Sequence, residues 1–318
     1  MSVAPLSRGQ RSGGSKAGYP SHDPSIRFDT TSLLDLLPRH ITTSTNALTP
    51  MTTAPWTAHV SRRWFNPQAW HLRWHKLLAM GQGGGQYLPV QALGQAMRLP
   101  KAAHRQFWQG PHADERSLSF LADALPSQGV FFDIGTNIGV YSTALWLAKG
   151  GDMTVQAFEP IPSTIEVLKE TLSLNQVTAH IEAIALSDHV HTLTLSAYDN
   201  GANNFWVTDA QADIPTLSVS AVPLDEWMLH HDRIPDAMKI DVEGHELAVL
   251  QGAQATIQAY KPALLIECHC GSWESLGVSR QAMVALIESF GYAQVGDRWG
   301  RPVDLLTQPS TVHLLCSD

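Results

Sequence analysis

The sequence predicts an α/β fold with a mainly parallel sheet that is covered by helices on both faces. From residue 130 onward, short apolar segments alternate with helical patterns, which is typical of β-α-β units. A glycine-rich turn, Asp133-Ile134-Gly135-Thr136-Asn137-Ile138-Gly139, follows the first of these segments. Acidic residues follow several of the apolar segments, at Asp133, Glu159, Asp188, Asp241 and Glu267. Ligands of open α/β sheets bind at the carboxyl ends of the strands, so these residues mark a candidate site.

The individual elements follow from hydrophobic periodicity and from helix-start signals. A helix over 115–125 leads into a buried strand at 130–134, and the glycine-rich turn joins that strand to a helix from residue 140. Farther along, the patterns predict strands at 153–158, 180–186, 237–241, 263–267, 292–295 and 311–315, and helices at 163–174, 246–260 and 279–290.

Two local signals add detail to this order of elements. Residues 192–196 and 216–222 are expected to form an antiparallel insertion around the turn Asp199-Asn200-Gly201. Ser163 with Glu166 three positions later predicts a capping box at the start of the helix over 163–174.

The distribution of charge argues against a nucleic-acid substrate. The chain has 318 residues, is 44% hydrophobic and carries a net charge of −8. Residues 1–80 hold nine Lys/Arg and three Asp/Glu, whereas residues 81–318 hold twelve and twenty-six. Phosphate binding needs a basic surface, which an acidic main domain does not offer.

The cysteines and the apolar segments indicate in which cellular compartment the protein is expected. Three cysteines, Cys268, Cys270 and Cys316, form no disulfide framework, so a reducing, cytoplasmic location is expected. Cys268-His269-Cys270 lacks the second pair that zinc sites typically use, which predicts buried thiols. No apolar run approaches the roughly 20 residues that span a bilayer. The N-terminus also lacks the apolar segment of a secretory signal.

Three regions are expected along the chain. Residues 1–60 are rich in Ser, Thr, Pro and Gly and are predicted to be disordered or weakly ordered. Residues 61–128 are expected to pack as helices and strands on the domain formed by 129–318. A helix at 64–80 either packs on its own domain or lies on a membrane surface, because one of its faces carries Trp70, Trp74, Leu77 and Leu78.

The aspartate of the glycine-rich turn discriminates between nucleotide ligands. A pyrophosphate would lie at the helix start, where the Asp133 carboxylate would repel it. Two unit charges about 4 Å apart cost about 4 kcal/mol at an effective dielectric constant near 20. S-adenosylmethionine has no phosphate and offers a cationic amino group. The turn therefore favours S-adenosylmethionine over NAD, with Gly135, Asn137 and Gly139 letting the backbone approach the ligand. The alternative is an ordinary turn with an Asp helix cap.

Two further acids are assigned to the cofactor. Glu159 follows Gly139 by twenty residues and ends the next strand, where an acidic residue binds a ribose diol. Its alternative role is that of an acid at a helix start. Asp188, at a later strand end, is expected near the adenine.

The segment Lys239-Ile240-Asp241-Val242-Glu243-Gly244-His245-Glu246 is the second distinctive motif. Charged residues beside a buried strand are costly unless they are paired or functional. Methyl transfer to a hydroxyl needs an oriented nucleophile and a base. We therefore expect Asp241 and Glu243 at the reaction centre, with Glu243 and His245 as candidate bases. The alternative is that Glu243 and Glu246 stabilise the helix dipole.

A metal site is not predicted. Asp241, Glu243 and Glu267 supply the oxygen ligands that hard cations prefer. The sequence nevertheless offers no dedicated metal-binding loop.

Taken in order, these segments resemble the FkbM family of S-adenosylmethionine-dependent methyltransferases. The matching pieces are Asp133 to Gly139, Phe158-Glu159-Pro160, Leu174-Asn175, Ala185 to Asp188, Pro223-Leu224-Asp225, Lys239 to Glu246, Leu250 to Ala253 and Pro262 to Glu267. The similarity covers about residues 115–295. It implies a seven-stranded class I methyltransferase fold, a donor bound by the first two pieces, and methylation of hydroxyls on sugars, polyketides or other small molecules. His245 stands where the family often has a smaller residue, so no general catalytic role is implied for it.

The combined expectation is an S-adenosylmethionine-dependent O-methyltransferase that acts on a small molecule or glycan. Segments 86–115 and 198–215 are expected to build the acceptor pocket, with apolar walls from Phe107, Trp108, Phe205 and Trp206. Two other functions stay open: an NAD-dependent oxidoreductase, and a non-catalytic S-adenosylmethionine-binding protein that recruits a partner. The sequence identifies neither the acceptor nor the oligomeric state.

Overall fold

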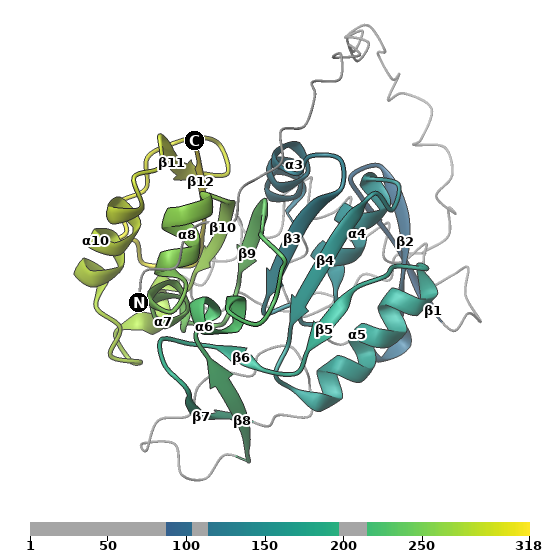
Figure 1. Cartoon of the computed structure of the whole chain (residues 1–318), viewed down its shortest axis with the longest axis horizontal. Coiled ribbons are helices and arrows are strands. Elements are labelled where there is room, and N and C mark those ends of the chain that lie inside the picture. The colour runs from purple at the N-terminus through teal and green to yellow at the C-terminus, as the bar shows by residue number, and fades with distance from the viewer. Residues whose placement is uncertain (1–86, 104–113, 197–214) are drawn as a thin grey trace, which may run out of the picture. The chain divides into compact units, whose positions relative to one another are not determined.

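The computed structural model describes residues 87–103, 114–196 and 215–318 (Figure 1). All of these residues belong to one unit of the chain, His71–Asp318. The predictions for residues 1–80 lie outside the described residues. The same holds for the turn at 199–201 and for the four aromatic residues expected in the acceptor pocket, Phe107, Trp108, Phe205 and Trp206.

A seven-stranded sheet lies at the centre of this unit, in the order β11-β12-β10-β9-β3-β4-β5. β12 pairs antiparallel with both β10 and β11, and the other neighbours are parallel. The predicted mainly parallel, seven-stranded sheet is therefore confirmed. Its strands are β3 (Gly129–Ile134), β4 (Met153–Phe158), β5 (His180–Glu182), β9 (Ala237–Ile240), β10 (Ala263–Cys268), β11 (Gln294–Asp297) and β12 (Val312–Ser317).

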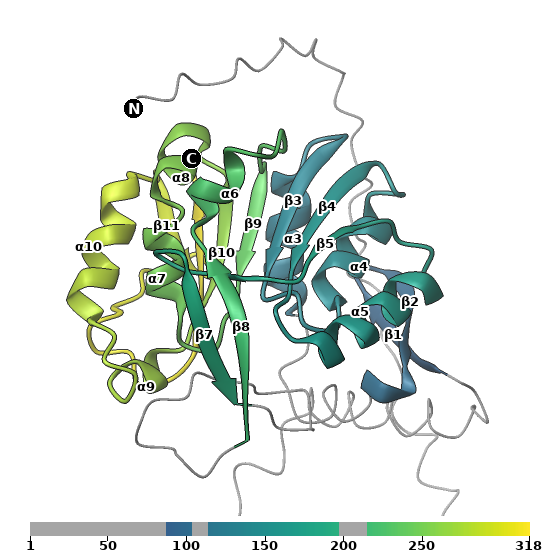
Figure 2. The ribbon, with the colours of Figure 1, turned by 60° about the horizontal axis from the view of Figure 1, so that its bottom comes forward.

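Helices cover both faces of the sheet, as predicted (Figures 1 and 2). One face is covered by α3 (Glu115–Ala124), α4 (Val140–Ala148) and α5 (Pro162–Leu174). The other is covered by α6 (Leu224–Met228), α7 (Glu246–Gln251), α8 (Gln254–Tyr260) and α10 (Arg280–Phe290), with the short α9 (Cys270–Trp273) nearby. Phe132, Phe158 and Trp227 pack edge to face at the centre of this second face, with ring centroids 5.1–5.8 Å apart.

Two smaller sheets flank the central one. β1 (Tyr87–Ala92) and β2 (Gln95–Pro100) form an antiparallel hairpin, followed by the 3-10 turn η1 (Lys101–Ala103), and β2 packs on α4 and α5. β6 (Ala185–Leu186), β7 (His191–Ser196) and β8 (Thr216–Val222) form the second, in which β7 and β8 are antiparallel. This confirms the predicted antiparallel insertion. It lies at the carboxyl edge of the central sheet (Figure 1).

Two predicted elements are divided in the structure. The strand expected at 180–186 separates into β5, which pairs with β4, and β6, which pairs with β8. The helix expected at 246–260 separates into α7 and α8 at Gly252, where a Cβ atom would lie 1.9 Å from the Ser187 carbonyl oxygen. The Asp225 carboxylate then accepts hydrogen bonds from the backbone N–H groups of Ala255 and Thr256, 2.8 Å each, and starts α8.

The predicted capping box on α5 is wrong. Ile161 occupies the N-cap, and Pro162 fills the first helical position, where its missing N–H costs nothing. Glu166 instead pairs with Lys169 at 2.9 Å on the exposed face of the helix.

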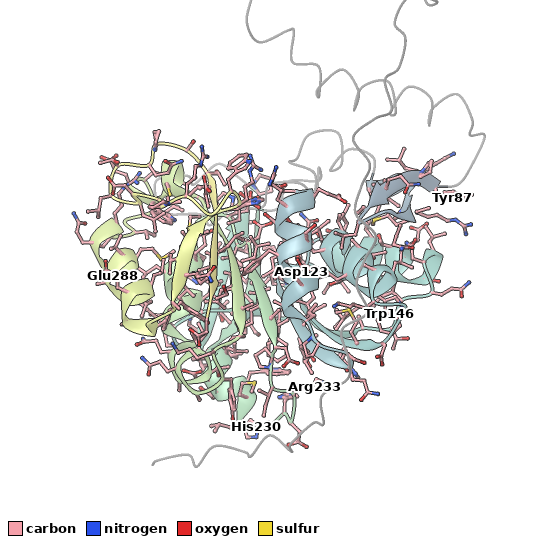
Figure 3. The ribbon with its side chains drawn as sticks, turned by 90° about the horizontal axis from the view of Figure 1, so that it is seen from above. Tyr87, Asp123, Trp146, His230, Arg233 and Glu288 are labelled. Atoms are coloured by element: carbon pink, nitrogen blue, oxygen red, sulfur yellow. The ribbon has the colours of Figure 1, made fainter. Side chains whose placement is uncertain are left out.

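Exposed charged side chains lie on the outside of α3 and α10, where Figure 3 marks Asp123 and Glu288. The three cysteines are buried free thiols, as predicted. Within the described ranges, every helix is too short or too polar to cross a bilayer.

Candidate functional site

The turn after β3 is fixed by the ends of its neighbouring strands. The N–H groups of Gly135 and Thr136 donate to the Phe158 carbonyl at 3.0 and 3.1 Å. Gly135 has φ of 72°, and a Cβ there would lie 1.8 Å from the Asp241 carbonyl oxygen. At Gly139, φ is 82° and a Cβ would lie 2.5 Å from Leu168 Cδ1. The Asp241 carbonyl leaves no room for a side chain at Gly135, and the left-handed backbone favours glycine at both positions. These contacts within the protein do not test the predicted approach of a ligand to the turn.

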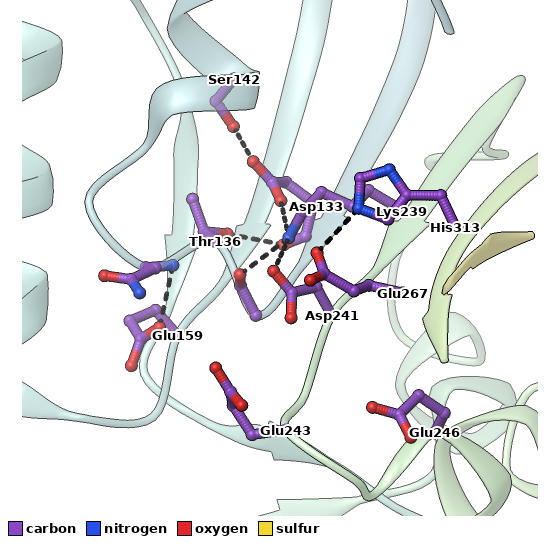
Figure 4. Close-up of polar contacts among 12 residues, drawn as sticks. Asp133, Thr136, Ser142, Glu159, Lys239, Asp241, Glu243, Glu246, Glu267 and His313 are labelled. Atoms are coloured by element: carbon purple, nitrogen blue, oxygen red, sulfur yellow. Dashed lines mark hydrogen bonds and ion pairs between the residues drawn. The ribbon is translucent and has the colours of Figure 1, made fainter. Parts of the chain in front are cut away.

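Asp133 is fully buried beside a lysine rather than facing a ligand. It pairs in register with Lys239 on the neighbouring strand β9, and Ser142 Oγ donates to Asp133 Oδ2 at 2.6 Å (Figure 4). Lys239 Nζ lies 3.7 Å from Asp133 Oδ1 and 3.1 Å from Asp241 Oδ2, and it donates to the Gly135 carbonyl at 3.2 Å. Lys239 thus supplies a positive charge beside Asp133 within the protein, and the predicted attraction of Asp133 for a cationic ligand stays a prediction.

The pKa values of Asp133 and Lys239 are set by burial and by the charges beside them. Burial raises the pKa of Asp133, although Lys239 and Ser142 oppose the rise. Burial alone would lower the pKa of Lys239, but the carboxylates of Asp241 and Asp133 raise it well above its usual value. Lys239 is therefore charged, and it holds the ends of β3 and β9 together.

A cavity opens at the carboxyl ends of β3, β4 and β9, and we refer to it as the first cavity. It brings together six of the predicted site residues: Gly135, Asn137, Glu159, Asp241, Glu243 and His245. Its opposite wall is apolar and comes from β6, β7 and the α5 N-terminus, through Ile161, Leu186, Leu193 and Leu195. Asp133, Gly139 and Asp188 do not belong to its wall.

Glu159 and Asn137 form the polar part of the first cavity. Glu159 is 5% exposed and accepts hydrogen bonds from the N–H groups of Asn137 and Ile161, 3.0 Å each. Burial raises the pKa of Glu159 to about 7, against the effect of these two amides. Asn137 has φ of 52°, and its buried Oδ1 has no hydrogen-bond partner among the described residues. An unsatisfied buried acceptor in a cavity wall suits a ligand donor.

Glu243 lies between the first cavity and a second one. The second cavity has a volume of about 810 Å³ and is lined by residues that include Glu243, Glu267, His269, Arg298, Trp299 and His313. Glu243 belongs to both walls. Its backbone is left-handed, with φ of 53°, a conformation that strains non-glycine residues and that occurs at functional sites as well as at turns. Burial and the Asp241 carboxylate raise the pKa of Glu243 to about 7, which His269 opposes.

His245 and Asp188 lie on adjoining pockets, and their predicted roles stay predictions. His245 Nε2 lies 2.9 Å from Ser187 Oγ, and burial lowers the pKa of His245 to about 3. An imidazole with such a pKa is a weak proton acceptor, so this geometry favours a packing role. Asp188 lies on another pocket, which shares His245 with the first cavity, and it pairs with His189 at 2.8 Å. The first cavity offers apolar side chains where Asp188 was expected to meet the adenine.

Sequence reasoning missed the role of His269. Its Nδ1 lies 2.8 Å from the fully buried Glu246 Oε1, and its Nε2 lies 3.3 Å from Glu243 Oε2. The hydrogen bond to Glu246 and the nearby carboxylates raise the pKa of His269 to about 9, although burial opposes them. The signal was present in the sequence as Glu267-x-His269 directly after an apolar strand.

Similarity to known proteins identifies the family of this chain. A family profile described as "Methyltransferase FkbM domain" matches residues 133–293, just over half of the chain. The chain belongs to the FkbM methyltransferase family. The family match contains the turn, Glu159 and the segment 239–246, so the resemblance seen in the sequence is confirmed.

Among the relatives of this FkbM-family chain are two curated methyltransferases. Methyltransferase sdnD of Sordaria araneosa is 28% identical over 206 residues, covering 55% of this chain and 77% of the relative. Hexuronic acid methyltransferase AglP of Haloferax volcanii is 24% identical over 184 residues, covering 57% and 74%.

A solved structure, methyltransferase FkbM from Methylobacillus flagellatus KT, matches with a TM-score of 0.44 and 18% identity. The match covers 67% of this chain, which spans about half the length of that structure.

Proposed function

We propose that this FkbM-family protein is an S-adenosylmethionine-dependent O-methyltransferase that acts on a hydroxyl group of a saccharide or another small molecule. The observation that carries the proposal is the position of Glu243, which lines both the first and the second cavity. A donor in the first cavity and an acceptor in the second would meet at this carboxylate.

The first cavity fits an adenosyl compound without phosphate. Its wall combines the orphan acceptor Asn137 Oδ1 with the buried carboxylate of Glu159, and its opposite side is apolar. Glu159 would accept hydrogen bonds from ribose hydroxyls, and each such charge-assisted bond contributes on the order of 1.5–3 kcal/mol. Ile161, Leu193 and Leu195 would pack on the adenine. When it is bound, S-adenosylmethionine supplies an activated methyl group.

The same wall disfavours NAD. Glu159, Asp241 and Glu243 are three carboxyl groups in one cavity, and Asp241 stays ionised because Lys239 and His269 lower its pKa against the effect of burial. A pyrophosphate there would face like charge at short range. The oxidoreductase alternative therefore has no observation in its favour.

The proposed step needs a base beside the acceptor hydroxyl. Glu243 is placed to take that proton, because its carboxylate is reached from the acceptor side. Asp241 and Lys239 would hold the floor of the site in position. The second cavity is lined by carboxylates, guanidinium groups and the half-exposed Trp299, which suits a polar, polyhydroxylated acceptor. The relative AglP acts on hexuronic acid, a ligand of this chemical kind.

Calorimetry tests the donor. We expect S-adenosylhomocysteine to bind the full chain at micromolar strength and NAD to show no binding. Glu159→Ala should lower the affinity for S-adenosylhomocysteine at least tenfold. The matched control is Glu166→Ala, which removes an exposed carboxylate of α5 and should leave the affinity unchanged. Binding of NAD in place of S-adenosylhomocysteine would refute the proposal.

Isotope transfer tests the reaction. Incubation with donor carrying a labelled methyl group and host extract should give a labelled small molecule or glycan. Glu243→Gln should bind S-adenosylhomocysteine normally and lose at least a hundredfold in labelling, since it keeps the shape but not the base. Donor binding without any transfer by the wild type would support the non-catalytic alternative.

A further inference from the structure

We propose that Asp241, Glu267 and His269 bind a divalent metal ion at the boundary of the second cavity. The atoms Asp241 Oδ1 and Glu267 Oε1 each lie 3.9 Å from His269 Nε2, and the three residues offer donor atoms that all lie within 4.8 Å of one another. Ligands held about 2.0–2.2 Å from a metal are separated by roughly 3–4.4 Å. The observed spacing therefore leaves room for one ion.

Each of the three side chains is held from outside by its other polar atom. Asp241 Oδ2 pairs with Lys239 at 3.1 Å, and Glu267 Oε2 pairs with His313 at 3.3 Å (Figure 4). These partners leave Asp241 Oδ1 and Glu267 Oε1 directed at the common point near His269. Partners of this kind orient the ligands of metal sites in proteins.

The histidine is oriented by a buried carboxylate, which is itself held by two further hydrogen bonds. Glu246 is fully buried, and its Oε1 lies 2.8 Å from His269 Nδ1. Trp273 Nε1 donates to Glu246 Oε2, and the Gly244 N–H donates to Glu246 Oε1, 2.8 Å each. With Nδ1 hydrogen-bonded to Glu246, Nε2 is the nitrogen that faces the carboxylates. It lies 3.3 Å from Glu243 Oε2 in the structure, and a metal ion would replace the proton shared in this contact. A carboxylate behind a histidine that faces other ligands is the usual arrangement at such centres.

The charge balance of the cluster points the same way. The carboxylates are Asp133, Asp241, Glu243, Glu246 and Glu267, and the basic groups that pair with them are Lys239, His269 and His313. Carboxylates are in excess although these side chains are mostly buried. Excess buried negative charge is costly, and a divalent cation removes it.

Two carboxylate oxygens and one imidazole suit a first-row divalent ion such as Mn²⁺, with Mg²⁺ and Zn²⁺ as the oxygen-preferring and nitrogen-preferring alternatives. Three protein ligands leave coordination positions open towards the second cavity. This step rests on the proposed function. The ion would hold the acceptor oxygen beside Glu243, and Glu243 would receive the proton of the acceptor hydroxyl. Metal-bound hydroxyl groups lose a proton more readily than free ones.

Mn²⁺ binding to the chelator-treated full chain, followed by electron paramagnetic resonance, tests the site. We expect one Mn²⁺ per chain, and competition by MgCl₂ and ZnCl₂ ranks the three ions. Glu267→Gln and His269→Ala should each weaken Mn²⁺ binding at least tenfold. Glu246→Gln should weaken it less, since it disturbs only the orientation of the imidazole.

A second cluster supplies the matched control. Asp188, His189 and His191 also gather donor atoms within 4.8 Å, but on the exposed surface. The variant His189→Ala should leave Mn²⁺ binding unchanged. Absence of stoichiometric Mn²⁺ binding, or Mn²⁺ binding that is lost in His189→Ala and retained in His269→Ala, would overturn the proposal.

Binding of S-adenosylhomocysteine serves as the folding control, because Glu267 and His269 line only the second cavity. A chain that binds S-adenosylhomocysteine but no metal would refute the metal site and leave the proposed function standing. A chain that binds Mn²⁺ at these residues but no S-adenosylhomocysteine would do the reverse.

Discussion

At the scale of single residues, Lys239 holds the site together. Its ammonium group lies between Asp133 and Asp241 and is nearly inaccessible to solvent. Breaking a buried ion pair from one side leaves uncompensated charge, which is far more costly than losing an exposed pair.

We predict that Lys239→Met lowers the free energy of unfolding by about 3–5 kcal/mol, because two buried carboxylates lose their counterion. The control Lys169→Met removes an exposed ammonium and should change stability by less than about 0.5 kcal/mol. Urea denaturation at pH 7 measures both. Equal effects of the two substitutions would show that Lys239 is not the counterion described here.

His245 makes the free energy of unfolding depend on pH, and its buried neutral form stabilises the fold at neutral pH. Its pKa is lowered to about 3 in the folded chain from a usual value of 6.5, so the unfolded chain binds the proton more tightly. The contribution is complete above pH 6.5 and is lost as the pH falls towards 3. Between pH 7 and pH 5 the wild type should lose about 2 kcal/mol more stability than His245→Asn. Parallel losses in the two proteins would mean that His245 is not buried in its neutral form.

At the scale of elements, α8 depends on a cap from a distant segment. Asp225 accepts hydrogen bonds from Ala255 N, Thr256 N and Thr256 Oγ1 at 2.6–2.8 Å. We predict that Asp225→Ala costs about 1–2 kcal/mol of stability, as is typical of a lost N-cap. Glu226→Ala, at the exposed neighbouring position, should change little. Thermal denaturation of the two variants compares them directly, and equal midpoints would disprove the cap.

Two glycines with positive φ can be compared: Gly135 in the turn after β3 and Gly150 in the turn after α4. Gly135 and Gly150 have φ of 72° and 62°, but a Cβ meets the Asp241 carbonyl at 1.8 Å only at Gly135, whereas Gly150 has nothing within 4 Å. Gly150→Ala should therefore lower the free energy of unfolding by only about 1–2 kcal/mol, the cost of a left-handed backbone at alanine. Gly135→Ala should cost more and should abolish binding of S-adenosylhomocysteine, measured by calorimetry. If Gly135→Ala still binds S-adenosylhomocysteine, the turn does not take part in binding the cofactor.

At the scale of the whole molecule, the sequence predicted most of the sheet and several residues that line the first cavity. Alternating apolar segments located β3, β4, β9 and β10, because buried parallel strands leave a continuous apolar signal. The rule that ligands bind at the carboxyl ends of such strands selected Glu159, Asp241 and Glu243, and all three line the first cavity.

What the sequence could not predict are the partners that come from distant parts of the chain. Asp133 meets Lys239 because β9 lies next to β3, an order that local patterns do not encode. Glu267 meets His313 through the antiparallel pairing of β10 with β12. The assignment of Asp133 to a cationic ligand did not include Lys239 for this reason, since this counterion lies more than a hundred residues away in sequence.

A crystal structure of the full chain with S-adenosylhomocysteine tests most directly whether the two cavities meet at Glu243. We predict the nucleoside in the first cavity, with its ribose hydroxyls on Glu159 and its sulfur facing Glu243 and the second cavity. Density for the ligand in the second cavity, or on the surface beside Asp188, would contradict the arrangement of donor and acceptor sites described here.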